Sequence, residues 1–156
     1  MNIRRAEKKD LKKVTELLSE VLEIHAKIRP DIFISGTTKY TDDELLEIFR
    51  DDSRPVFVAV DDHDNVQGYA FCKFERQPFS TNMRDFKTLY IDDLCVDQNT
   101  RGQGIGKKLY DYVCAFAKEN GCYDITLNVW EGNDSARKFY DRIGLKVKET
   151  TLEHIL

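Results

Sequence analysis

The feature that most restricts the fold of this chain is the glycine-rich segment Arg-Gly-Gln-Gly-Ile-Gly at residues 101–106. It follows the apolar run 89–96 and precedes a long amphipathic stretch, so the sequence predicts a strand, a tight loop and a helix in succession. The first turn of a helix has backbone N–H groups without intrahelical partners and lies at the positive end of the helix dipole. Because glycine permits close backbone approach, this arrangement is typical of a phosphate-binding loop.

The spacing of these glycines excludes two common phosphate-binding loops. A dinucleotide fingerprint that starts at Gly102 requires glycine at position 107, which is Lys107. A Walker A loop that ends at Lys107 requires glycine at 101 and Ser or Thr at 108, where the chain has Arg101 and Lys108. The remaining pattern, Arg-x-x-Gly-x-Gly, is by itself also compatible with a turn that binds no ligand.

The residues after the loop continue a regular alternation of elements. An apolar stripe at steps of three and four predicts a helix over 104–120, which Gly121 ends. The alternating, β-branched segment 123–130 predicts a strand. Asn133 is a favourable N-cap for a last helix that ends at Gly144. The loop is therefore followed by a helix, a strand and a second helix.

Two of these segments carry a family resemblance. The loop resembles the acetyl-CoA loop of the GNAT superfamily of N-acetyltransferases, Gln/Arg-x-x-Gly-x-Gly/Ala. Residues 133–145, Asn-x-x-Ala-x-x-Phe-Tyr-x-x-x-Gly-Leu, resemble a second segment of the same superfamily. Because two independent segments about thirty residues apart agree, the chain is identified as a member of this superfamily.

The N-terminal part completes the expected fold. Hydrophobic periodicity and turn signals predict strands and helices over 2–6, 8–28, 41–50, 55–60 and 67–74. The order β-α-α-β-β-β-α-β-α-β matches the resemblance over essentially the whole chain, as one domain over 1–156. The resemblance implies an α/β GNAT-like fold with a central twisted mixed sheet, flanking helices, and splayed fourth and fifth strands. The last expected strand is the alternating tail 147–156, which is available for a homodimer.

Composition restricts the class of protein further. The net charge of −4 argues against nucleic acid as a partner, and no apolar run approaches the ~20 residues that span a bilayer. The N-terminal residues 1–5 lack the apolar core of a signal peptide, which predicts a cytoplasmic protein. The three histidines are far apart and the four cysteines form no C-x-x-C pair, so no metal site is predicted.

The resemblance implies acetyl-CoA as co-substrate and a set of binding residues. In the superfamily, main-chain groups of the fourth strand pair with the pantetheine arm, and the N–H groups of the loop bind the pyrophosphate. Carried over to this sequence, the cofactor-binding residues are Leu94, Cys95, Val96, Arg101, Gly102, Gln103, Gly104, Ile105, Gly106, Lys107 and Asn133.

The resemblance also implies two catalytic residues. Tyr140 is at the position of the acid that protonates the departing thiolate. The segment around Asp92 and Asp93 is similar to the polyamine-acetyltransferase branch, which has glutamate, its proposed base, at the position of Asp92. On a regular strand, these two side chains point to opposite faces, so we expect Asp93 to be structural. Asp92 is then either the base or an anchor for a cationic substrate.

The expected activity is acetyl transfer to a primary amine of a small-molecule or polyamine-like acceptor, by direct attack in a ternary complex. A protein lysine or N-terminal acetyltransferase and a catalytically weak acetyl-CoA sensor remain alternatives. Asn128 weighs against the N-terminal branch, which has glutamate there. Acceptor specificity is expected to depend on residues 25–41 and 75–88, which have no recognisable motif. The candidate pocket residues there are His25, Arg29, Phe33, Tyr40 and Phe79.

Overall fold

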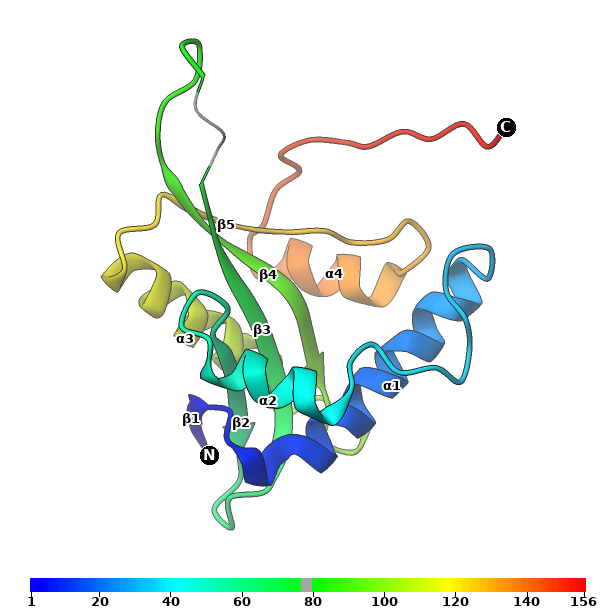
Figure 1. Ribbon diagram of the computed structural model, residues 1–156, viewed down its shortest axis with the longest axis vertical. Helices are drawn as coiled ribbons and strands as arrows, with labels where there is room; N and C mark the ends of the chain where they lie inside the picture. Colours follow the sequence, from blue (N-terminus) through cyan, green and yellow to red (C-terminus); the bar gives the residue numbers. More distant parts are fainter. Residues whose placement is uncertain (77–79) are drawn as a thin grey trace.

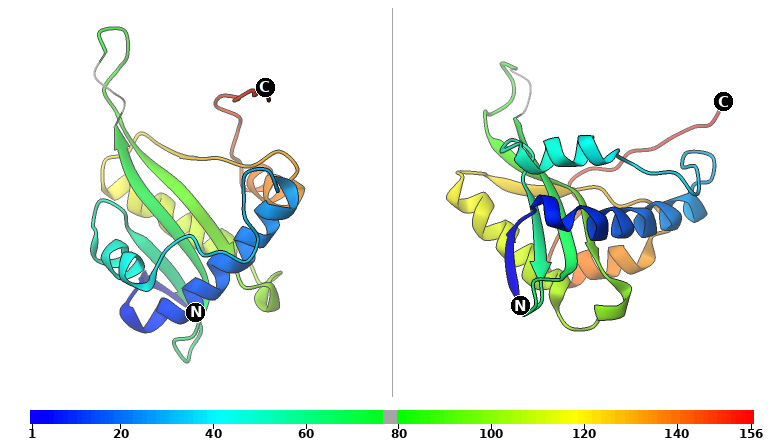
Figure 2. Two further views of the ribbon diagram at one scale, coloured as in Figure 1. Left: turned by 45° about the vertical axis from the view of Figure 1, so that its right-hand side comes forward. Right: turned by 60° about the horizontal axis from the view of Figure 1, so that its bottom comes forward.

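The computed structural model describes residues 1–76 and 80–156. It contains a five-stranded sheet in the order β1-β2-β3-β4-β5, with helices packed on both faces (Figures 1 and 2). The strands are β1 (Asn2–Arg5), β2 (Val56–Val60), β3 (Val66–Arg76), β4 (Lys87–Val96) and β5 (Asp124–Leu127). The helices are α1 (Leu11–Ile28), α2 (Asp42–Arg50), α3 (Ile105–Glu119) and α4 (Asp134–Arg142), with short 3-10 turns at Lys8–Asp10 and Gln98–Thr100. The predicted α/β fold with a mixed sheet is confirmed.

The direction of each strand determines how the strands are connected. Strands β1 to β4 pair as antiparallel neighbours, whereas β5 lies parallel to β4. A parallel pair requires a crossover, which α3 provides. One core cluster packs α1 and α2 on one face of the sheet, and a second packs α3 on the other face.

Local capping residues set the helix boundaries near the expected positions. The hydroxyl of Thr41 accepts a hydrogen bond from the backbone N–H of Glu44 at 3.2 Å and so caps α2. The side-chain oxygen of Asn133 accepts from the N–H of Ala136 at 3.4 Å and caps α4. Gly121, with a φ of 72°, follows the end of α3 in the left-handed conformation that favours glycine.

Strands β4 and β5 separate, as the family resemblance implies. Their register runs from Thr88 opposite Asp124 to Ile91 opposite Leu127, where β5 ends. Strand β4 continues to Val96, so its edge beyond Ile91 is not paired with β5. The predicted strand 123–130 is therefore too long at both ends, because only four of its residues pair with β4.

A β-bulge in β4 overturns the expectation for Asp92 and Asp93. In the register with β3, Phe71 faces Asp93 and the next residue faces Ile91, so that Asp92 is the extra residue. Ile91 and Leu94 both pack into the cluster on the α3 face. An extra residue interrupts the alternation of side chains. Asp92 and Asp93 therefore face the same side, and both line one cavity beside α1.

The C-terminal tail also differs from the prediction. No strand follows α4, and the chain after Leu145 is extended (Figure 1). Its contacts with the rest of the molecule include ion pairs of Lys148 with Asp124 and of Glu153 with Arg29. Leu152 is 89% exposed and Ile155 is 72% exposed. An alternating pattern forms a strand only where a neighbouring strand can accept its hydrogen bonds, and the described part of this sheet provides none for the tail.

Candidate active site

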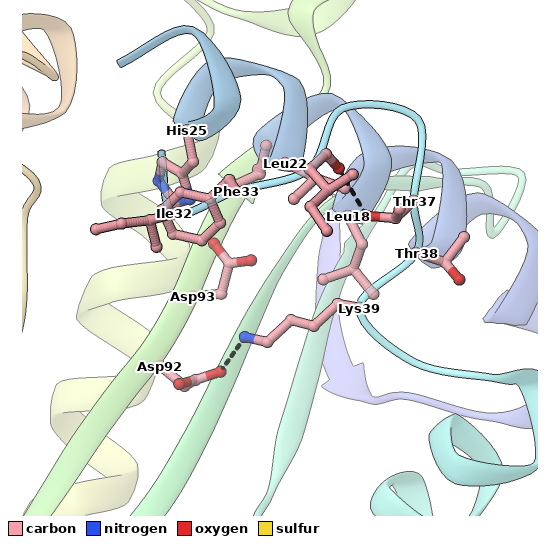
Figure 3. Close-up of a pocket in the computed structure, with 12 residues that line it drawn as sticks. Leu18, Leu22, His25, Ile32, Phe33, Thr37, Thr38, Lys39, Asp92 and Asp93 are labelled. Atoms are coloured by element: carbon pink, nitrogen blue, oxygen red, sulfur yellow. Dashed lines mark hydrogen bonds and ion pairs between the residues drawn. The ribbon is translucent and has the colours of Figure 1, made fainter. Parts of the chain in front are cut away.

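A cavity of about 340 Å³ lies between α1, the segment that follows α1, and β4 (Figure 3). This volume is in the range of small-molecule binding sites. Its walls are apolar and consist of Leu18, Val21, Leu22, Ile32, Phe33 and Ile34. Its polar lining consists of His25, Thr37, Thr38, Lys39, Asp92 and Asp93. The cavity can therefore hold a small molecule that combines an apolar body with a polar or charged end.

Asp92 forms an ion pair inside this cavity. The ammonium of Lys39 donates to Asp92 Oδ2 at 2.7 Å, and the two side chains are 42% and 39% exposed (Figure 3). Burial lowers the pKa of Lys39, but the hydrogen bond and the charge of Asp92 outweigh burial, and the net shift is upward. Lys39 is therefore a cation throughout the physiological pH range.

Asp93 is the more buried of the two carboxylates. Tyr69, which is fully buried, donates its hydroxyl to Asp93 Oδ2 at 2.8 Å. Burial raises the pKa of Asp93 to about 6, although the Tyr69 hydrogen bond acts in the opposite direction. A carboxyl with this pKa is ionised at neutral pH and is still basic enough to accept a proton from an ammonium group.

Tyr140 lies in α4 and keeps its proton. Burial raises its pKa above the ordinary value, and the nearby charge of Asp93 and Cys95 raises the pKa further. Its ring packs edge-on against Phe139 with the ring centroids 5.2 Å apart. A phenol with a raised pKa is available as a hydrogen-bond and proton donor at neutral pH.

The glycine loop has the backbone geometry of an anion site. Gly102 and Gly104 have φ values of 81° and 75°, and a Cβ atom at either position would meet no atom within 4 Å. The first backbone hydrogen bond of α3 runs from the N–H of Lys108 to the carbonyl of Gly104. The N–H groups just before Lys108 therefore have no partner within the helix. Both features fit a phosphate group at this end of α3.

The third glycine has a different role from the one its position suggests. Gly106 lies inside α3, and a Cβ atom there would approach the ring of Phe139 to 3.1 Å. Gly106 thus allows close packing of α3 against α4. The ammonium of Lys107 is paired with Asp111 at 2.6 Å, and both side chains are exposed.

The other predicted site residues fall into separate places. Leu94, Cys95 and Val96 lie on β4 beyond its pairing with β5, as a main-chain site for a ligand requires. His25 and Phe33 line the cavity, with their ring centroids 5.2 Å apart.

Trp130 packs edge-on against Phe33, with the ring centroids 5.3 Å apart, and its ring lies 5.9 Å from the Arg29 guanidinium. Tyr40 instead stacks on Phe71, next to the core. Phe79 lies outside the described residues.

Sequence reasoning missed two features of the site. Lys39 had no motif to mark it, because it lies in the irregular segment between α1 and α2. The orientation of Asp93 depends on the bulge, and the sequence of β4 has no local pattern that predicts a bulge. The segment 25–41 was nevertheless expected to border the acceptor site, and it provides seven of the residues that line the cavity, namely His25, Ile32, Phe33, Ile34, Thr37, Thr38 and Lys39.

Two features are absent from the described ranges, 1–76 and 80–156. No group of three or more His, Cys, Asp or Glu side chains is placed to hold a metal ion. None of the helices there is both long enough and apolar enough to cross a membrane.

A glycine loop at the start of α3, separated strands β4 and β5, and an adjoining acidic cavity define the class of fold built for acyl-CoA-dependent transferases. The sequence model described as "Acetyltransferase (GNAT) family" matches residues 18–145. The chain belongs to this family, which confirms the resemblance seen in the sequence.

Similar proteins agree with this assignment. The peptidyl-lysine N-acetyltransferase YjaB of Salmonella typhimurium is 31% identical over 115 residues, which cover 74% of this chain and 66% of that protein. The chain thus spans somewhat less than two thirds of the length of this relative. A crystal structure of a point mutant of the BH1408 protein from Bacillus halodurans has a TM-score of 0.95 and 32% identity, covering 100% of this chain and 99% of that chain.

The aminoglycoside N-acetyltransferase AAC(6')-Iy, solved in complex with CoA, shares the fold with a TM-score of 0.71 and 16% identity. The structural match covers 99% of this chain and 98% of that chain.

Proposed function

We propose that this protein is an acetyl-CoA-dependent N-acetyltransferase that modifies a primary amine of a small-molecule or polyamine-like acceptor. The observation that supports this most directly is the bulge in β4, which turns Asp92 and Asp93 into one cavity. Two carboxylates beside an apolar wall suit an ammonium group attached to an apolar body. The cavity adjoins the open edge of β4, so donor and acceptor can meet in a ternary complex.

The residues present fit acetyl-CoA, which supplies a thioester as the acetyl donor. The N–H groups at the start of α3 and the two left-handed glycines, Gly102 and Gly104, suit the pyrophosphate. Leu94, Cys95 and Val96 lie on β4 beyond its pairing with β5, which supports the proposal that their main-chain groups pair with the pantetheine arm.

Each proton in the reaction has a residue to accept or donate it. Asp92 anchors the acceptor ammonium, and Asp93 accepts one of its protons, which leaves a nucleophilic amine. A backbone N–H near Cys95 stabilises the oxyanion that forms when the amine attacks the carbonyl carbon. Tyr140 donates its proton to the departing thiolate as the carbon–sulfur bond breaks, and its phenolate takes up the second proton, which the nitrogen loses as the amide forms.

A protein lysine is the main alternative acceptor, because its side chain has the same ammonium on an apolar stem and one relative is named a peptidyl-lysine N-acetyltransferase. A catalytically weak sensor is less consistent with a protonated tyrosine beside a basic carboxylate. A thiol-release assay with acetyl-CoA and a panel of monoamines, polyamines, aminoglycosides and lysine peptides tests these options. Release of CoA with no amine of the panel would contradict the enzymatic proposal.

We expect the Tyr140→Phe variant to lower kcat by up to ~100-fold, because phenylalanine keeps the packing against Phe139 and removes the proton donor. The dissociation constant of acetyl-CoA should change less than ~3-fold. Stopped-flow kinetics and calorimetry measure the two quantities. Phe139→Leu alters the same packing contact and keeps the hydroxyl, so it is the matched control. A Tyr140→Phe enzyme with full kcat would remove the acid role.

We also propose that the protein forms a homodimer through its tail, because residues 147–156 include the exposed apolar side chains Val147, Leu152 and Ile155 and have no strand partner. A second copy can supply the missing neighbour strand. Sedimentation of the full chain should give a dimer, and deletion of 146–156 should give a monomer. A full chain that sediments as a monomer at ~50 μM, a concentration at which interfaces of standard size are occupied, would contradict this proposal.

A further inference from the structure

The acceptor cavity contains its own ammonium group. Lys39 reaches across the cavity from the segment between α1 and α2, and its Nζ lies 2.7 Å from Asp92 Oδ2 (Figure 3). The carboxylate of Asp92 is also the group that would attract a substrate ammonium. Since one carboxylate oxygen of Asp92 is engaged by Lys39, a bound amine has to share Asp92 and rely on Asp93.

The charges that face the cavity can be counted from its lining. Asp92 and Asp93 provide two negative charges above pH 6, and Lys39 provides one positive charge. His25 adds none, because burial first and the charge of Lys39 second lower its pKa and keep the imidazole neutral. The lining therefore has a net charge of about −1 at neutral pH. Arg29, which directly follows α1 and does not line the cavity, is paired with Asp31 and Glu153.

We propose that Lys39 is a specificity-determining residue: its ammonium reduces the acceptor cavity to a single net negative charge. Of the two acceptor classes proposed above, the site then selects small monocationic amines with an apolar body over diamines and polyamines. This inference rests on the proposed acetyl transfer and names the substrate class of the same site. A monoamine balances the remaining charge, and its apolar part fits the walls formed by α1 and the segment after it. A second ammonium would enter the cavity without a carboxylate of its own and would meet Lys39.

The test compares two amines of equal chain length, pentylamine and 1,5-diaminopentane, on wild type and on Lys39→Met. Methionine keeps an unbranched apolar stem and removes the charge. In Lys39→Met, the ratio of kcat/KM for the diamine to that for the monoamine should rise about tenfold. Lys39→Arg should keep the wild-type ratio. Lys118→Met removes a charge from the exposed C-terminal end of α3, on the other face of the sheet, and should leave the ratio unchanged.

Calorimetric binding of the same two amines to each variant gives a readout that does not depend on catalysis. A Lys39→Met protein that acetylates amines with an unchanged ratio would overturn the role of Lys39 and leave the enzymatic proposal intact. A shift of the binding ratio without any acetyl transfer would support the role of Lys39 and contradict the enzymatic proposal. A diamine preferred by the wild type would also overturn the inference.

Discussion

The Asp93→Asn variant should be at least ~10³-fold slower than wild type in kcat/KM and at the same time more stable. The loss of rate follows from the loss of the group that accepts the proton of the acceptor. The gain of stability follows from the raised pKa of Asp93, because a charge that burial disfavours is removed while the Tyr69 hydroxyl keeps an acceptor. A shift from the ordinary value to about 6 corresponds to about 3 kcal/mol at pH 7.

The pH dependence of this effect has a defined sign. Between the unfolded pKa, near 3.8, and the folded pKa, about 6, the folded state binds more protons at Asp93 than the unfolded state. The contribution of Asp93 to the free energy of unfolding of the wild type is therefore fully present below pH ~4 and is lost as the pH rises through 6. The stability advantage of Asp93→Asn should be largest at pH 7 and vanish below pH ~4.

The kinetic profile provides a second check. The wild-type kcat/KM should fall below pH ~6 as Asp93 becomes protonated, and Asp93→Asn should lack this acidic limb. Urea unfolding at pH 4 and pH 7, together with the pH–rate profile, measures both effects. Asp92→Asn is the matched comparison: it alters a more exposed carboxylate and should keep the acidic limb while weakening acceptor binding. If the Asp93→Asn enzyme keeps the wild-type rate, a group other than Asp93 accepts the proton of the acceptor ammonium.

The Gly104→Asp variant should lose acetyl-CoA affinity by more than ~100-fold, or about 3 kcal/mol, while it remains folded. The position precedes α3 with a φ of 75°, and an added Cβ atom meets no neighbour. Aspartate tolerates this backbone conformation better than most residues. The damage is therefore electrostatic, since the new carboxylate lies where the pyrophosphate is expected.

Gly104→Asn separates charge from size at this position. Asparagine has nearly the same volume and the same backbone cost as aspartate, and we expect it to lose less than ~10-fold in affinity. Isothermal titration with CoA measures both variants. Equal losses would indicate a steric effect, and unchanged binding in a folded Gly104→Asp protein would remove the assignment of the glycine loop to the phosphate.

Several parts of this protein were determined by the sequence alone. The glycine spacing at 101–106 and the Asn133-to-Gly144 segment identified the family, because both patterns depend on local backbone geometry and on one helix face. Helix limits were predicted closely where a capping residue marks them, as at Thr41 and Gly121. These features involve residues that are near each other in the chain.

Other parts were decided only by the tertiary structure. The face of the sheet to which Asp92 and Asp93 point depends on how β4 aligns with β3. A bulge of one residue moves the side chains that follow it to the opposite face. The pairing of Lys39 with Asp92 joins residues 53 positions apart. The tail also shows that sequence alone is not sufficient. Its pattern predicts a strand, but a strand forms only where a neighbouring strand can accept its hydrogen bonds. The sequence determined the class of fold, and the alignment of strands decided which charges meet in the cavity.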